Sequence, residues 1–167
     1  GIVRSYQIPR VFSELTVLEN MIAPILPELK TYTNSPEIVE KAKRILEMIG
    51  LRDKSNTMAE KLSVGQKRLL ELGRILMLDP KVVMLDEPTA GIHPLMIKSI
   101  LNLLSSIHRE KNISLIIVEH NIKFIREIAH RIIVMNSGQI IYEGSPDDAI
   151  KDPRVIEVYI GHVGESR

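Results

Sequence analysis

The sequence contains no cysteine and no tryptophan, and only 4% of its 167 residues are aromatic. A chain without cysteine has no disulfide framework, no thiolate ligand for zinc and no thiol nucleophile. Lys and Arg number 22 against 21 Asp and Glu, so the formal net charge is only +1. This balance provides no strong field to hold nucleic acid, and the few aromatic rings leave little surface for stacking on bases. We therefore expect no nucleic-acid partner.

Long hydrophobic runs are also missing. Charged residues or Asn interrupt each apolar stretch within about ten residues, which predicts that the chain does not cross a membrane. Residues 2–13 lack the charged-then-apolar layout of a signal peptide. The first residue is Gly1, so we expect that it is not the natural start. The remaining composition, 44% hydrophobic and 26% charged, is typical of one globular domain.

Helical periodicity fills the first half of the sequence. Thr16 and Glu19 form the pattern of a capping box, which predicts a helix over 17–22. Apolar residues at helical spacing predict two longer amphipathic helices, one over 36–49 and one that starts at Ser63 and runs to a break at Asp79 and Pro80. We expect no strand before residue 82.

The second half alternates strands with helices. A continuous apolar run at 82–85 is typical of a strand that is buried on both faces. A helix over about 94–109 and a strand at 115–118 complete a β-α-β unit, whose two strands should be parallel. The later elements are expected to be a helix at 122–129, a hairpin of 132–135 with 140–142, and a helical tail from Ser145.

Two carboxylates come directly after the first of these strands. Asp86 and Glu87 stand at its carboxyl end, where open α/β sheets bind ligands. Asp86 can there hold Mg²⁺ through its water shell, while Glu87 orients or deprotonates a water molecule. In the alternative interpretation, Asp-Glu-Pro caps the strand and starts a loop.

A second candidate stands at the start of the helix that begins at Ser63. Ser63 offers a hydroxyl, Gly65 permits close backbone approach, and the first helical turn has free N–H groups that suit a phosphate. The alternative is a plain N-cap serine with an incidental glycine. The basic residues around this helix start are expected to form a solvated face: Lys61, Lys67, Arg68 and Arg74.

Two single residues complete the set of candidates. His120 follows the strand at 115–118, where an imidazole can hydrogen-bond a terminal phosphate. Gln7 can offer a carbonyl oxygen to a metal or to an attacking water. Either residue alone is uninformative, and only the order and spacing of all four elements point to a function.

The four elements occur as YQIPRVF around Gln7, LSVGQ at 62–66, VVMLDEP at 82–88 and VEH at 118–120. They resemble the Q-loop, signature motif, Walker B motif and H-loop of ABC-type ATPases, and the resemblance covers nearly the whole chain. A finer likeness is to the ATP-binding subunits of branched-chain amino acid importers. It is carried by RSYQIPRVFSELTVLENM, by AGIHP and by the tail GSPDDAIKDPRVIEVYIG.

The resemblance implies an enzyme that binds ATP and Mg²⁺ and hydrolyses the ATP. Asp86 would support Mg²⁺, Glu87 would be the general base and His120 would be the switch histidine. Gln7 would touch Mg²⁺ and the γ-phosphate region, and it would couple the site to a membrane subunit.

The resemblance also implies that the site is shared between two subunits. Ser63, Gly65 and Gln66 would bind the γ-phosphate of the ATP held by the opposite subunit, in a homodimer or heterodimer. Transmembrane permease subunits would be the other partners, and residues 8–14 would pass motion to them. The protein would contact the membrane only through the permease, as a peripheral subunit on the cytoplasmic face of the cell membrane.

The fold implied by the resemblance is α/β, an incomplete P-loop NTPase (RecA-like) core of ABC type with a helical subdomain. Residues of about 15–79 would form the helical signature subdomain. Residues 1–14 and 80–145 would form a portion of the RecA-like core, and 146–167 a C-terminal helical tail.

The sequence departs from the ABC pattern most clearly in what precedes the Q-loop. No G-x-x-x-x-G-K-[ST] motif occurs, so the Walker A loop that cradles the phosphates is missing. The chain therefore resembles the C-terminal portion of an ABC ATPase, and we predict that it shows no ATPase activity alone. Without the Walker A strand, the strands at 82–85 or 115–118 should have open edges and exposed apolar faces, which favours self-association.

A second departure is His93, where the D-loop usually carries Asp or Asn. This substitution puts the communication role of that loop in doubt.

Two other functions stay open. One is a non-transport ABC ATPase of DNA repair or translation, although the long insertions of those relatives are missing between Gln7 and the signature motif. The other is a shortened, non-catalytic subunit that donates its signature motif in trans.

Overall fold

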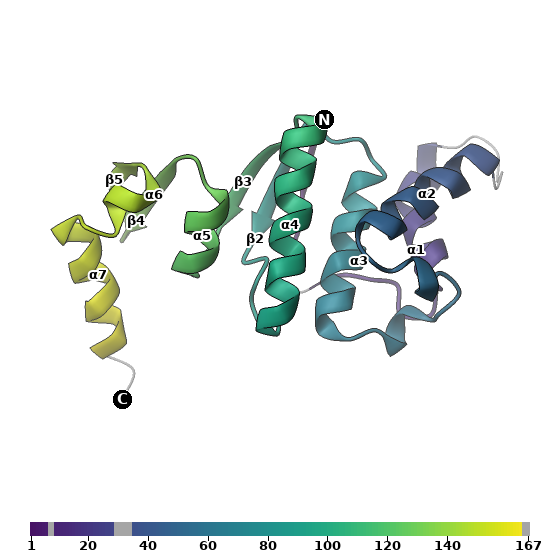
Figure 1. The fold of residues 1–167 in the computed structure, drawn as a ribbon, viewed down its shortest axis with the longest axis horizontal. Coiled ribbons are helices and arrows are strands. Elements are labelled where there is room, and N and C mark those ends of the chain that lie inside the picture. The colour runs from purple at the N-terminus through teal and green to yellow at the C-terminus, as the bar shows by residue number, and fades with distance from the viewer. Residues whose placement is uncertain (7–8, 29–34, 165–167) are drawn as a thin grey trace. The chain divides into compact units, whose positions relative to one another are not determined.

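The computed structural model describes residues 1–6, 9–28 and 35–164. The chain divides into two units, residues 1–120 and residues 121–167, and each is described by itself (Figure 1). The expected functional residues all belong to the first unit.

Three parallel strands form the sheet of the first unit, in the order β1-β2-β3. Strands β2 and β3 flank helix α4 and form the expected β-α-β unit. Strand β1 is a correction to the sequence analysis, which expected no strand before residue 82. Three residues are too short a run to show periodicity, and β1 exists because it pairs along β2. The bounds are β1 Ile2–Arg4, β2 Val82–Asp86, α4 Pro94–Lys111 and β3 Ser114–Val118.

The two faces of this sheet differ in burial. Val83 and Leu85 of β2 are 1% and 2% exposed, whereas Ile116 and Val118 of β3, on the opposite face, are 52% and 62% exposed. The buried residues of α4 are all apolar, which is typical of a helix that covers a sheet. One apolar face is therefore open among the described residues, as the sequence analysis expected. The expected open edge is confirmed only for β3, because β2 is paired on both sides.

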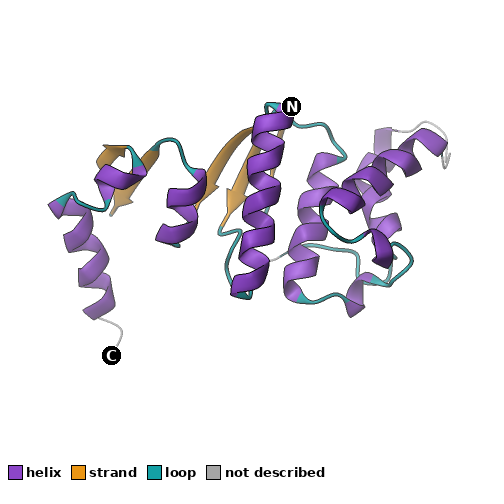
Figure 2. Cartoon of the chain, in the orientation of Figure 1, coloured by secondary structure: helices purple, strands orange, loops and turns teal. Residues whose placement is uncertain are grey.

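Helices occupy the part of the first unit between β1 and β2 (Figure 2). The capping box predicted at Thr16 and Glu19 is present at the start of α1. Gly73 lies where three helical segments meet, since a Cβ added there would lie 2.8 Å from Ile49 Cδ1 and 3.0 Å from Met21 Sδ. The bounds are α1 Val17–Ile22, η1 Ala23–Glu28, α2 Pro36–Met48, η2 Arg52–Lys54, η3 Ala59–Lys61 and α3 Val64–Leu76.

The second unit contains the expected hairpin. Strands β4 and β5 pair antiparallel, and Ser137 and Gly138 between them have positive φ angles of 48° and 79°. Positive φ at both positions is what a two-residue hairpin turn requires. The bounds are α5 Ile122–Ile128, β4 Ile132–Asn136, β5 Gln139–Gly144, α6 Pro146–Ala149 and α7 Pro153–Gly164. In the described parts of both units, no helix is long and apolar enough to span a bilayer.

Candidate functional site

The carboxyl ends of β2 and β3 bring Glu87 and His120 together. The backbone N–H of Glu87 donates to the carbonyl of Val118 at 2.9 Å, which ties the residue after β2 to the end of β3. Glu87 Oε1 lies 3.7 Å from His120 Nδ1, and the two side chains are 31% and 71% exposed. Glu87 also has a φ of 43°, a conformation that is uncommon for residues other than glycine and is often found at functional sites.

The buried carboxylate of Glu119 holds the backbone on both sides of this pair. Its side chain is fully buried and accepts a hydrogen bond from the backbone N–H of Thr89 at 2.9 Å. It also accepts from the Thr89 hydroxyl and, at 2.8 Å, from the backbone N–H of His120. The loop after Glu87 is thus fastened to the end of β3. Sequence reasoning did not assign Glu119 a role, although it stands directly before His120.

Asp86 ends β2 and is held by the neighbouring strand. Its Oδ2 lies 3.1 Å from Nη2 of Arg4, and its backbone N–H donates to the Ser5 hydroxyl at 3.3 Å. A carboxylate oxygen suits a hard cation such as Mg²⁺. The described residues contain no group of three or more His, Asp or Glu side chains that could enclose a metal.

The signature motif lies at the start of α3 and forms a second capping box. Ser63 is the N-cap residue, and its Oγ accepts from the Gln66 backbone N–H at 3.3 Å. In return, Gln66 Oε1 accepts from the Ser63 backbone N–H at 3.0 Å. Ser63 is therefore an N-cap residue, as the alternative interpretation expected. It does not exclude the phosphate interpretation, because the positive end of the helix dipole lies at this point.

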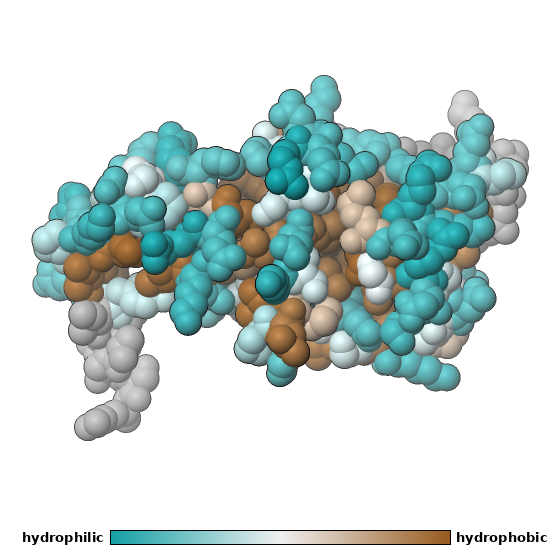
Figure 3. Space-filling model, viewed as in Figure 1, coloured by the Kyte–Doolittle hydropathy of each residue, from teal (hydrophilic) through white to brown (hydrophobic). Residues whose placement is uncertain are grey.

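Gly65 has a packing reason for being glycine. A Cβ at this position would lie 3.0 Å from Met96 Cγ, so glycine lets the start of α3 approach the start of α4. The two helices consequently begin at the same end of the unit (Figure 1). Val64 and Leu95 expose apolar side chains there, at 57% and 78%, and Figure 3 shows apolar surface at this end of α4.

Arg68 corrects the expectation of a solvated basic face. Its side chain is 1% exposed and lies 2.7 Å from Glu71 Oε2. Its Nη1 also donates to the carbonyl of Tyr6 at 2.9 Å, and its Nη2 to the carbonyl of Glu87 at 3.5 Å. Burial raises the pKa of Glu71, an effect that Arg68 opposes. The i,i+3 spacing of Arg68 and Glu71 in the sequence is the signal that could have revealed this pair.

Gln7 and His93 are the two remaining candidates. Gln7 lies outside the described residues, so its predicted role stays a prediction. His93 is the N-cap residue of α4, where its Nδ1 accepts from the Leu95 backbone N–H at 3.4 Å. This gives His93 a local structural role.

A shallow groove of about 390 Å³ lies on the same unit, beside the residues that follow β1. Arginine side chains cover its two exposed aromatic rings, with Arg10 4.2 Å above the Tyr6 ring and Arg74 4.7 Å above the Phe12 ring. Partial burial lowers the pKa of Arg74. The groove combines positive charge with apolar surface, and its other lining residues include Pro24, Ile75 and Leu78.

The fold and these motifs define an ATP-binding cassette, and comparison with known proteins agrees. Residues 1–90 match the family described as ABC transporter. The probable branched-chain amino acid transport ATP-binding protein LivG of Archaeoglobus fulgidus is 38% identical over 172 residues, which cover 96% of this chain and 66% of the relative. The high-affinity branched-chain amino acid transport ATP-binding protein LivG of Escherichia coli (strain K12) is 34% identical, over 96% of this chain and 68% of the relative.

Solved structures give the same result. The ADP conformation of an ATP-binding cassette of an ABC transporter superposes with a TM-score of 0.82 at 36% identity, covering 96% of this chain and 68% of that chain. A nucleotide-free ATP-binding cassette superposes with a TM-score of 0.76 at 33% identity, over 95% of this chain and 68% of that chain. The chain therefore belongs to the ABC transporter family of ATP-binding proteins. It spans about two thirds of the length of these relatives.

Proposed function

We propose that this chain is part of the ATP-hydrolysing, energy-coupling subunit of an ABC importer, and that the importer carries branched-chain amino acids. The observation that carries the proposal is the meeting of Glu87 and His120 at 3.7 Å, at the carboxyl ends of two parallel strands. The names of the most similar relatives support the choice of transported solute.

In this proposal Glu87 is the general base that activates the attacking water. Its half-buried carboxylate faces His120, which can donate a hydrogen bond to the leaving phosphate and report its departure. Glu119 positions both residues, because it fastens the loop after Glu87 and the backbone of His120. A fixed arrangement of this kind accelerates hydrolysis mainly through positioning and electrostatics.

The other half of the site is supplied by a second ATP-binding subunit. Ser63, Gly65 and Gln66 of one chain would face the γ-phosphate of the ATP held by its partner. The start of α3 suits this role because its dipole favours a negatively charged ligand. The exposed apolar side chains of Val64 and Leu95, at the same end of the unit, favour an interface between copies there.

This chain contains some of the residues that would bind ATP and Mg²⁺, but not the Walker A motif. Asp86 would hold Mg²⁺ through its water shell, together with Gln7, and the metal would neutralise charge on the phosphates. In the structure Arg4 forms an ion pair with Asp86, so a bound cation would compete with Arg4 for this carboxylate. The Walker A motif is missing from the sequence, so we further propose that this chain alone hydrolyses no ATP.

The groove beside Tyr6 and Phe12 is the surface that we assign to the permease. Exposed aromatic rings under arginine side chains suit a segment of a membrane protein with an apolar face and an acidic residue. Tyr6 and Arg10 line the groove and stand on either side of Gln7 in the sequence, so we propose that binding there is transmitted to the ATP site through this segment. In this proposal the protein is peripheral at the cytoplasmic face of the membrane, and the permease is its attachment.

The test compares this chain with a version extended upstream by a Walker A region. We expect the extended version to hydrolyse ATP and this chain to bind and hydrolyse none. In the extended version, Glu87→Gln should lower kcat by a factor of about 10² to 10⁴ while ATP still binds, because it removes only the base. Steady hydrolysis by this chain that is lost on Glu87→Gln would contradict the proposal, as would full activity of the extended Glu87→Gln variant.

A further inference from the structure

The two oxygens of the Glu119 carboxylate hold two different segments of the first unit. Oε1 accepts from the backbone N–H of Thr89 at 2.9 Å and from the Thr89 hydroxyl, whereas Oε2 accepts from the backbone N–H of His120 at 2.8 Å. The side chain is fully buried, so water does not compete for these bonds. A carboxylate is planar and rigid, and Glu119 therefore fixes Thr89 relative to His120.

The segment that joins Glu87 to helix α4 is tightly turned. The Ala90 backbone N–H donates to the Glu87 carbonyl at 3.1 Å, and the Ile92 N–H donates to the Thr89 carbonyl at 3.2 Å. Thr89 and Ile92 are both buried. Closely packed segments transmit strain instead of absorbing it. A displacement of the start of α4 is therefore passed back along this segment to Thr89.

The start of α4 is the part of this segment that a second subunit would reach. His93 is the N-cap residue of α4, and Leu95 behind it has an exposed apolar side chain. The start of α3 packs closely on the same turn, because a Cβ at Gly65 would lie 3.0 Å from Met96 Cγ. The His93 side chain caps its own helix, whereas Thr89 makes the contact that continues to the end of β3.

We propose that Thr89 is a positioning residue for His120, and that the Glu119 carboxylate transmits the docking of a second subunit from the start of α4 to this histidine. The inference rests on the function proposed above and deepens it, because it names the contact through which the dimer regulates the ATP site. In the chain alone, His120 Nδ1 lies 3.7 Å from Glu87 Oε1. A shift of about 1 Å changes such a separation into a hydrogen bond.

The first test uses this chain without nucleotide. Thr89→Val keeps the size of the side chain and the backbone N–H but removes the hydroxyl bond to Glu119. The NMR signals of the His120 amide and imidazole should shift, and exchange of this amide should become about tenfold faster, because the carboxylate that holds it is less restrained. Ser106→Ala is the matched control: it removes a hydroxyl bond to the Leu103 carbonyl within α4 and should leave His120 unchanged.

Two further variants of this chain complete the first test. Thr89→Ser keeps the hydroxyl, so it should give His120 signals close to those of the unmodified chain. Glu119→Gln has a similar shape but only one acceptor oxygen, so it cannot hold both segments. Exchange at the amide of Thr89, of His120 or of both should then become faster. This variant decides the matter if Thr89→Val does not fold.

The second test follows docking in the version extended by a Walker A region and carrying Glu87→Gln. We expect ATP to form the dimer and to shift the His120 imidazole signals. With Thr89→Val added, the dimer should form with unchanged affinity, but the shift at His120 should be about half as large or less, because the coupling is weakened. With Glu87 intact, Thr89→Val should lower kcat by about tenfold with little change in KM, since His120 is misplaced while ATP still binds. Thr89→Ser should recover most of the rate.

Each result bears on one step of the inference. Unchanged His120 signals in a folded Thr89→Val chain, or unchanged exchange at both amides in Glu119→Gln, would overturn the positioning role, as would an equal effect of Ser106→Ala. A Thr89→Val dimer that shifts His120 as fully as the unmodified dimer would overturn the transmission of docking. If the extended protein neither hydrolyses ATP nor dimerises with it, the function proposed above fails, and the spectra of this chain still decide whether Thr89 positions His120.

Discussion

Buried polar side chains fasten the loops around the candidate site. Asn20 on α1 is fully buried, and its side-chain amide donates to the carbonyls of Phe12, Leu15 and Thr16 at 2.9 to 3.2 Å. Its carbonyl oxygen accepts from the Phe12 backbone N–H at 2.9 Å. Asn20 thereby holds the segment that carries one ring of the groove assigned to the permease.

Asn20→Leu is predicted to destabilise this chain by about 2 kcal/mol, because it removes the hydrogen bonds of a buried amide and leaves the Phe12 backbone N–H without its acceptor. Urea unfolding of this chain measures the effect. Thr16→Ala is the matched control on the same helix and should cost only about 1 kcal/mol, since it removes one exposed cap. Equal costs for the two substitutions would contradict the role of Asn20.

Some features of single residues can be predicted from the sequence, and others cannot. The capping patterns at Thr16 and Ser63 are predictable, because a cap depends on residues three positions apart. The burial of Arg68 is not, because its partners Tyr6 and Glu87 are distant in sequence. A basic residue next to other basic residues looks solvated until the tertiary contacts are known.

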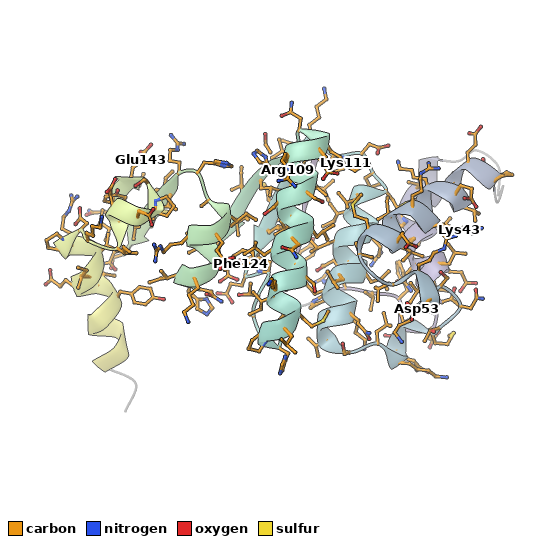
Figure 4. All side chains as sticks on the ribbon, in the orientation of Figure 1. Lys43, Asp53, Arg109, Lys111, Phe124 and Glu143 are labelled. Carbon is orange, nitrogen blue, oxygen red and sulfur yellow. The ribbon has the colours of Figure 1, made fainter. Side chains whose placement is uncertain are left out.

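At the scale of elements, the β-α-β unit, the hairpin and the amphipathic helices follow from periodicity and turn residues. Strand β1 does not, because its three residues take their structure from pairing with β2. The basic residues in the last turn of α4 were also not predicted. In Figure 4 the basic side chains of Arg109 and Lys111 lie at the C-terminal end of α4, where they complement the helix dipole.

Helix α7 begins with an ion pair whose pH dependence can be predicted. The Asp152 carboxylate accepts from Arg154 Nη2 at 2.7 Å and from the Arg154 backbone N–H at 2.9 Å. The side-chain hydrogen bond from Arg154 is the main cause that lowers the pKa of Asp152 from 3.8 to about 2. A lowered folded-state pKa means that the stabilisation is complete above pH 3.8 and is lost as the pH falls through about 2.

The measurement is an NMR titration of the Asp152 carboxyl carbon. We expect a midpoint near 2 in the unmodified chain, and a midpoint that returns toward 3.8 in the Arg154→Ala variant. Arg131→Ala is the control, because it removes a cation that pairs with Glu143 elsewhere in the same unit, and it should leave the Asp152 midpoint near 2. An Asp152 midpoint that stays the same in both proteins would show that Arg154 is not the cause.

At the scale of the molecule, the open edge of β3 predicts self-association. One edge of β3 pairs with β2, no partner is seen for the other edge in the described residues, and Ile116 and Val118 expose apolar side chains nearby. Such an edge is a template for pairing with another chain. Light scattering should show this chain to be oligomeric at micromolar concentration, and Ile116→Lys should shift it toward monomer because a charged side chain protects an edge. A monomer with β3 amides protected from exchange would contradict the prediction.

The central claim at this scale is that one ATP is held between Glu87 of one subunit and Ser63 of another. The most direct measurement uses the version extended by a Walker A region and carrying Glu87→Gln, so that bound ATP is not consumed. We expect ATP to convert this protein from monomer to dimer, and Ser63→Arg to abolish the dimer without changing the affinity of the monomer for ATP. Weaker ATP binding by the Ser63→Arg monomer itself, or a dimer that forms equally well with arginine at that position, would contradict a shared site.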